Sequence, residues 1–118
     1  MKKIVFDFNP LGNFSLSAEV YYEYYKEKYG REIYFYTREN GIYKKVIDIS
    51  KLKNSQNRVI TFVDLGDEVK KIPFDKDIRV NIIDESYEED ELLIEIVKKL
   101  GSLASWKNSK IKVLELAE

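Results

Sequence analysis

The chain has 118 residues, 20 of them lysine or arginine and 21 aspartate or glutamate, and it contains neither cysteine nor histidine. This length fits one domain with one core. The two missing residue types exclude disulfides, cysteine nucleophiles and the serine–histidine–aspartate triad. A net charge of −1 is unlike that of a basic nucleic-acid binder, so we expect no direct nucleic-acid partner. No apolar stretch reaches the length of a membrane span and no signal peptide opens the chain, so we expect no membrane partner and a cytoplasmic location.

The first predicted elements are a strand and a helix. Apolar and polar side chains alternate over residues 2–8, as they do in a strand. One face of this strand carries Ile4, Phe6 and Phe8. A helix follows between Ser17, whose hydroxyl suits the N-cap, and Gly30, which suits the left-handed residue after the last turn.

Residues 31–49 predict a β-hairpin. Two alternating runs flank Asn40-Gly41, the preferred dipeptide of a type I′ turn. A two-residue turn fixes the register, with Glu39 opposite Ile42, Tyr36 opposite Lys45, and Phe35 opposite Val46. The face that we expect to pack on the core carries Ile33, Phe35, Ile42 and Val46. The other face carries Tyr34, Tyr36, Arg38, Tyr43, Lys45 and Ile47.

The second half of the chain completes an α+β pattern. The predicted elements are a polar connector at 52–57, a strand at 58–63, a charged loop at 70–77, a short strand or extended crossing at 78–83, a helix ended by Gly101, and a closing strand at 110–116. Ser86 and Glu89 have the spacing of a capping box for that helix. The order β-α-β-β-β-(β)-α-β over residues 1–118 predicts a single α+β domain, with a mostly antiparallel sheet and two helices on one face.

Two segments of the sequence point to a family. Gly12-Asn13-Phe14-Ser15-Leu16-Ser17 follows the first strand, and residues 91–101, Ala104 and residues 110–116 form the closing helix and strand. Together they resemble the Gly-Gly-Phe-Ser-Leu-Ser loop and the "VVEELG…LKIVEI" ending of small uncharacterised bacteriophage and prophage proteins. The chain departs from this pattern at Asn13, where the family has a second glycine. The family has no established activity, so the resemblance implies a phage accessory protein that acts in the host-cell cytoplasm.

The loop at residues 12–17 is the first candidate site. Free amides at the start of a helix, together with the helix dipole, favour an anion. The alternative is simple helix capping with Phe14 in the core. On the first interpretation, the ligand site joins this loop to the polar face of the hairpin. The predicted ligand-binding residues are Gly12, Asn13, Phe14, Ser15, Ser17, Tyr34, Tyr36, Arg38, Tyr43 and Lys45.

Other side chains leave alternatives open. The nine tyrosines suit base stacking or a protein interface, or they are amphipathic surface with cross-strand pairs. Trp106 is either a lid over the core or an interface anchor. The acidic run at residues 85–91 is either a solvated helix start or a nucleic-acid mimic. Three carboxylates lie at predicted strand ends: Asp7, Asp64 and Asp84. They either bind Mg²⁺ or are the polar residues that commonly end a strand at a turn.

These observations favour a binding protein over an enzyme. We expect a phage-type, anti-defence accessory protein that sequesters a small anionic, nucleotide-derived ligand and needs no cofactor. The alternative is an inhibitor that binds a host or defence protein, as anti-CRISPR proteins do. A Mg²⁺-dependent nuclease or phosphatase is the third possibility. Outward-facing aromatic residues also predict a homo-oligomer, most simply a dimer.

Overall fold

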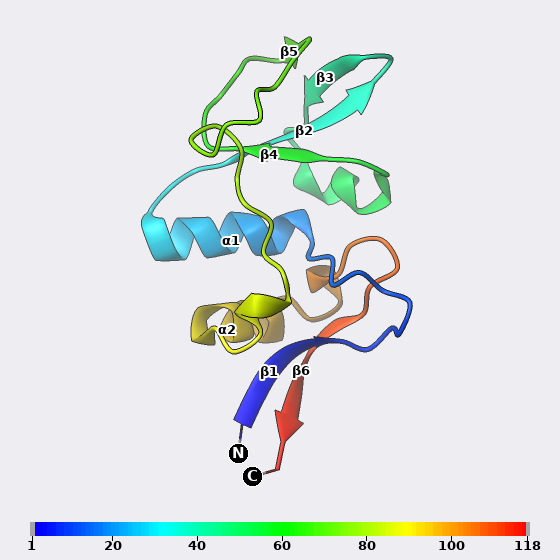
Figure 1. The fold of residues 1–118 in the computed structure, drawn as a ribbon, viewed down its shortest axis with the longest axis vertical. Coiled ribbons are helices and arrows are strands. Elements are labelled where there is room, and N and C mark those ends of the chain that lie inside the picture. The colour runs from blue at the N-terminus through cyan, green and yellow to red at the C-terminus, as the bar shows by residue number, and fades with distance from the viewer. Residues whose placement is uncertain (1, 118) are drawn as a thin grey trace.

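The computed structural model describes residues 2–117 and has an α+β fold, which confirms the predicted class (Figure 1). Its strands are β1 (Lys2–Asp7), β2 (Tyr34–Glu39), β3 (Ile42–Lys45), β4 (Val59–Thr61), β5 (Glu68–Val69) and β6 (Ile111–Leu116). Its α-helices are α1 (Ala18–Tyr29) and α2 (Glu91–Leu100). Short 3-10 turns are η1 (Ile49–Asn54), η2 (Glu85–Tyr87) and η3 (Gly101–Ala104).

The strands form two separate antiparallel sheets. β1 pairs with β6 alone, while the larger sheet has the order β4-β2-β3-β5. Figure 1 shows the two sheets at opposite ends of an elongated molecule of 50 × 30 × 23 Å, with α1 and α2 between them. The prediction of one sheet with both helices on one face is wrong, because the first and last strands pair with each other instead of joining the hairpin.

The helix boundaries follow from side-chain caps. The Ser17 hydroxyl accepts from Val20 N at 3.3 Å, and Gly30 ends α1 with φ of 60°, so both predicted ends are confirmed. Helix α2 has a different N-cap from the predicted one. Asp90 accepts from Leu93 N at 3.0 Å, and Ser86 lies instead in the separate turn η2. The predicted capping box is therefore wrong, because a carboxylate closer to the apolar run caps the helix.

The hairpin is confirmed in turn type and register. Asn40 and Gly41 have φ of 51° and 77°, as a type I′ turn requires. Tyr36 lies opposite Lys45, and Val46 N donates to Phe35 O at 2.8 Å. The predicted core face of the hairpin is confirmed at the end away from the turn, where Phe35 is buried.

The connecting segments are more ordered than a polar composition indicates. The predicted connector at 52–57 overlaps η1, where Leu52 is buried. Residues 78–83 form the extended crossing rather than a strand, bridging to β4 through Phe62 N to Ile78 O at 2.8 Å and Val80 N to Ile60 O at 2.9 Å. Ile83 N at the end of the crossing donates to the Tyr21 hydroxyl of α1 at 2.9 Å, so the crossing links the larger sheet to α1.

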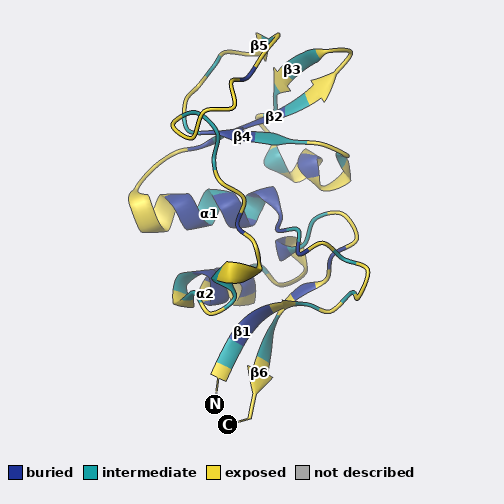
Figure 2. Cartoon of the chain, in the orientation of Figure 1, coloured by how far each residue is buried: buried dark blue, intermediate teal, exposed yellow. Residues whose placement is uncertain are grey.

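Buried side chains run along both helices and the inner strands (Figure 2). Tyr21 and Tyr24 of α1 belong to this core, with the ring buried and the hydroxyl bonded. The Tyr24 hydroxyl donates to Asp90 Oδ2 at 2.6 Å and accepts from Lys28 Nζ at 3.0 Å, which ties α1 to the start of α2. Within residues 2–117, no helix has the length and apolar character that a membrane crossing needs.

Candidate anion-binding site

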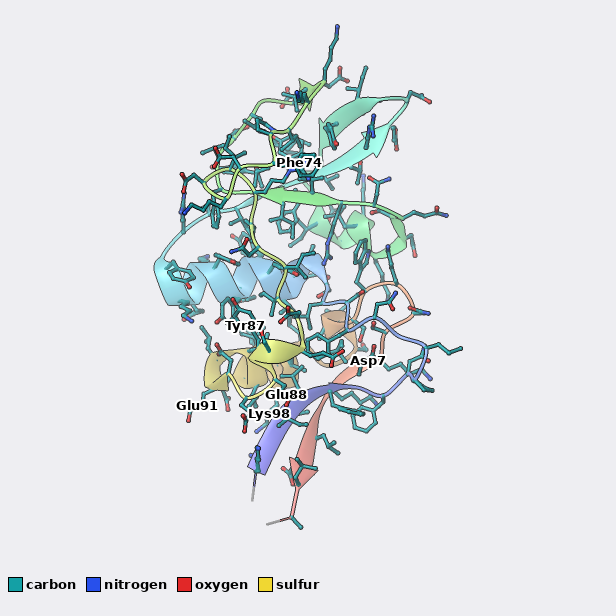
Figure 3. The ribbon with its side chains drawn as sticks, viewed as in Figure 1. Asp7, Phe74, Tyr87, Glu88, Glu91 and Lys98 are labelled. Atoms are coloured by element: carbon teal, nitrogen blue, oxygen red, sulfur yellow. The ribbon has the colours of Figure 1, made fainter. Side chains whose placement is uncertain are left out.

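Asp7 occupies the predicted anion seat before α1 (Figure 3). Its carboxylate accepts from the amides of Asn9, Phe14 and Lys110 at 3.0, 3.1 and 2.9 Å. Burial alone raises the pKa of Asp7, but the three amides hold it below its usual value of 3.8. A Cβ at Gly12 would lie 2.0 Å from Asp7 Oδ2, so glycine is needed for this close approach.

Other amides of the same loop are also in use. Ser15 N donates to Ser109 Oγ at 3.0 Å, and Ser17 N donates to Ala104 O at 2.9 Å. The amides of Phe14, Ser15 and Ser17 therefore donate to acceptors of the chain itself, so these three donors of the predicted anion seat are not free. Phe14 is buried, as the capping alternative expected, whereas Asn13 is exposed.

The polar face of the hairpin is partly covered. Tyr36 is fully buried; its hydroxyl donates to Gly66 O at 3.0 Å and accepts from Leu65 N at 2.9 Å. Lys45 forms an ion pair with Asp64 at 2.6 Å. Tyr36 therefore offers no free ring for stacking, because the segment before β5 lies over it.

The remaining hairpin side chains pair among themselves. Lys45 Nζ lies 5.7 Å from the centre of the Tyr34 ring, and the Arg38 guanidinium lies 5.6 Å from that of Tyr43. Figure 1 shows this hairpin in the upper sheet, whereas the loop after β1 lies beside the lower one. The structure thus divides the predicted ligand residues between two regions.

The three strand-end carboxylates also have separate partners. Asp7 binds the amides described above, Asp64 pairs with Lys45, and Asp84 caps η2 by accepting from Ser86 N at 2.9 Å. Among the described residues, no group of three or more aspartates and glutamates has a metal-binding arrangement.

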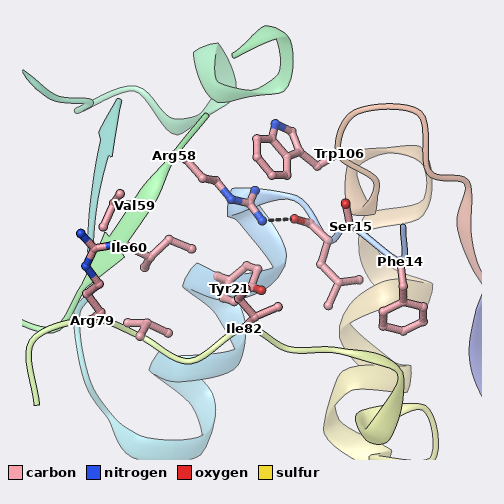
Figure 4. A pocket seen from close by; sticks show the side chains of 11 residues that line it. Phe14, Ser15, Tyr21, Arg58, Val59, Ile60, Arg79, Ile82 and Trp106 are labelled. Atoms are coloured by element: carbon pink, nitrogen blue, oxygen red, sulfur yellow. Dashed lines mark hydrogen bonds between the residues drawn. The ribbon is translucent and has the colours of Figure 1, made fainter. Parts of the chain in front are cut away.

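A cavity of about 270 Å³ combines the features expected of an anion site in a different place (Figure 4). It lies between the start of α1, strand β4, the crossing at 79–82 and the loop that carries Trp106. Its described lining contains two arginines, three aromatic side chains and no carboxylate. These residues are Phe14, Ser15, Leu16, Tyr21, Arg58, Val59, Ile60, Arg79, Val80, Ile82 and Trp106.

Arg58 is the central group of this cavity. Its guanidinium carbon lies 3.8 Å from the centre of the Trp106 ring and 5.0 Å from that of Tyr21. Nη2 donates to the backbone carbonyl of Leu16, but the buried Nη1 has no hydrogen-bond partner among residues 2–117. Burial lowers the pKa of Arg58 to about 10, so the group stays charged at neutral pH. A buried cation with an unused donor favours an anion beside it.

Trp106 holds one side of the cavity in place. The indole Nε1 donates to Leu52 O at 2.9 Å, and the Trp106 amide donates to Ser15 O at 3.0 Å. The half-buried ring therefore joins the turn η1 to the loop before α1. Trp106 is interpreted from the sequence either as a lid over the core or as an interface anchor. In the structure its ring lies over the cavity.

Arg79 provides a second positive charge at the cavity. Its guanidinium stacks on the exposed Phe74 ring at 3.9 Å. Nε and Nη2 donate to the carbonyls of Pro73 and Ile72 at 3.1 and 2.8 Å, which fix the side chain. Neither arginine is among the ligand-binding residues predicted from the sequence. The only local signal was a charged residue opening an apolar strand at Arg58.

Comparisons of the chain with protein-family models, with curated proteins and with solved structures find no significant match in any of the three.

Proposed function

We propose that the protein binds a small anionic ligand that carries a planar ring, as a nucleotide does, in the cavity around Arg58. The observation that carries this proposal is the unpaired, buried Nη1 of Arg58. A phosphate or carboxylate that accepts from the guanidinium would offset a desolvation cost of about 1–3 kcal/mol. The absence of any carboxylate from the described lining further favours an anion.

The shape of the site supports a planar ligand of limited size. The half-buried Trp106 ring and the guanidinium planes of the arginines offer flat surfaces on which a base can stack. The cavity volume of about 270 Å³ falls just below the usual range for ligand sites, roughly 300–1,000 Å³. A mononucleotide or a smaller anion suits this volume better than a dinucleotide.

We propose that the protein sequesters this ligand and does not catalyse its conversion. The chain has no histidine or cysteine to act as general base or nucleophile. The resemblance to phage accessory proteins supports a role in which the protein removes a nucleotide-derived signal of host defence.

Trp106 allows a direct test, because it is the only tryptophan of the chain and lines the cavity. The experiment titrates wild-type protein with AMP, GMP, cyclic AMP, adenosine and inorganic phosphate, and follows tryptophan fluorescence. We expect saturable quenching by at least one nucleotide and weaker binding of uncharged adenosine.

Variants assign the signal to the cavity. Arg58→Ala should weaken nucleotide binding about 100-fold, because hydrogen bonds to a charged group contribute roughly 1.5–3 kcal/mol. The control is Arg38→Ala, which removes an exposed hairpin arginine outside this cavity and should leave binding unchanged. Thermal unfolding checks that each variant is folded. The proposal fails if no nucleotide changes the fluorescence, or if folded Arg58→Ala binds as tightly as wild type.

A further inference from the structure

The sheet formed by β1 and β6 has one covered face and one open face. Val5 and Ile111 are buried in the core that includes Leu93 of α2. Because side chains alternate along a strand, the even-numbered residues point to the opposite face. That face, which we name the ribbon face, carries Lys2, Ile4, Phe6, Phe8, Lys110, Lys112, Leu114 and Leu116.

On the ribbon face Ile4 is buried and Leu114 is half-buried, but the two phenylalanines and Leu116 are exposed to solvent. Phe6 and Phe8 are 41% and 44% exposed, and their rings meet edge to face at 5.1 Å. Leu116 is 36% exposed at the other end of the face. The alternation predicted for residues 2–8 is real, but Val5, not Phe6, enters the core. Neighbouring exposed aromatic side chains on one sheet face are typical of a contact surface.

The edge of β6 adjoining this face is also open. Ile111 N donates to Ser105 Oγ at 2.8 Å, on the side of β6 away from β1. By alternation, the backbone groups of Val113 and Glu115 point to the same side. Beyond them the structure has no further strand within residues 2–117, since this sheet contains only β1 and β6. An open edge of this kind can accept an extended peptide as an added strand.

The charges of the ribbon face select the partner. Lys110 and Lys112 lie on it, and none of its described side chains is acidic. From the open edge, the exposed rings and this charge, we infer that the ribbon face docks an extended segment of a partner protein in which apolar residues alternate with or flank carboxylates. The segment adds to the edge of β6, so its side chains on this face lie directly beside Lys112 and Leu114. Its larger apolar side chains reach across β6 to Phe6 and Phe8 at β1.

A second copy of the chain fits this edge poorly. Two β6 strands paired about Val113 would need the outward groups of Ile111, where Ser105 already lies. Pairing about Glu115 would set two carboxylates directly opposite each other, which is unfavourable. A partner of different sequence avoids both problems.

The test selects peptides from a library of random dodecapeptides displayed on yeast, using the full chain as bait. We expect the selected peptides to combine Leu or Phe with Asp or Glu. The double variant Phe6→Ser/Phe8→Ser should bind them at least about ten-fold more weakly, the loss expected when one aromatic anchor is removed. The matched control is Phe74→Ser, since Phe74 is 91% exposed but lies toward the other end of the molecule (Figure 3).

Charge variants and two further assays complete the test. Lys112→Glu should weaken peptide binding, and Lys112→Arg should preserve it. Selected peptides that bind the double variant as well as wild type would overturn the inference.

Sedimentation that shows a wild-type dimer lost in the double variant would make a second copy the occupant. Binding of a labelled single-stranded oligonucleotide that depends on Phe6 and Phe8 would assign the face to nucleic acid. Either result would overturn the inference too.

Discussion

The loop before α1 and the cavity beside β4 each contain a partly buried charged group, and the hydrogen bonds of the two groups differ greatly. In the loop, Asp7 accepts three backbone amides. In the cavity, Arg58 keeps a buried nitrogen without an acceptor. Donors at a helix start therefore mark an anion site only if no carboxylate of the chain has filled it. Binding capacity remains where a charge is unpaired.

The largest effect on stability is expected from Asp7→Ala. The substitution leaves three amides without their shared acceptor and should lower the free energy of unfolding by about 3 kcal/mol, measured by urea denaturation. The control Asp77→Ala removes an exposed carboxylate and should cost less than about 0.5 kcal/mol. Equal losses in the two variants would mean that Asp7 does not organise the loop.

Gly12→Ala should have the next largest effect. The new methyl group would lie 2.0 Å from Asp7 Oδ2, so the loop must shift, at a cost of about 2 kcal/mol. Because the clash is with Asp7 itself, the same substitution should cost much less in the Asp7→Ala background. A double-mutant cycle by urea denaturation measures this coupling, and additive losses would contradict the proposed contact.

Acid should reduce the difference in the free energy of unfolding between wild type and Asp7→Asn. The pKa of Asp7 is lowered in the folded protein, so its contribution is present above the unfolded pKa near 3.8 and is lost as the pH falls through the folded pKa. Other carboxylates titrate in both proteins, so the measured quantity is the difference in their free energies of unfolding. A difference that stays constant into this acidic range would show that the Asp7 charge contributes nothing.

The smallest effect on the free energy of unfolding is expected from a substitution of Arg58, whose Nη1 lacks a hydrogen-bond partner among residues 2–117. Arg58→Met removes a buried cation with an unpaired nitrogen, but it also removes the bond to Leu16 and the contacts with Trp106 and Tyr21. These opposing terms should keep the change in unfolding free energy within about 1 kcal/mol. Urea denaturation measures it. A decrease in unfolding free energy as large as that of Asp7→Ala would show that the hydrogen bonds of Arg58 are already made within the chain. Asp7 and Arg58 would then not differ in this respect.

The features that were predictable from sequence depend on neighbouring residues. Ser17 and Gly30 bound α1, and Asn40-Gly41 sets the hairpin register, because caps and tight turns act within a few positions. Tyrosine faces were harder to interpret. A tyrosine suits either surface or core, so the alternating pattern did not reveal that the segment before β5 covers Tyr36.

The candidate site was not predictable for a different physical reason. Arg58 and Trp106 come from distant parts of the chain, and only tertiary packing brings their side chains together. The same holds for Asp7, whose partners include the amide of Lys110 at the far end of the sequence. The division into two sheets likewise depends on the pairing of β1 with β6, for which the alternating pattern of each strand carries no information.

The pairing of β1 with β6 has a consequence for synthesis of the protein. Lys2 lies opposite Leu116, so β1 leaves the ribosome well before its partner β6 has been synthesised. At about 5–20 residues per second, translation of the intervening chain takes roughly ten seconds. Throughout that time Val5 has no complete core to enter, and both edges of the nascent strand remain unpaired. The nascent chain, rather than the finished protein, is therefore the stage at which this fold is most exposed to aggregation.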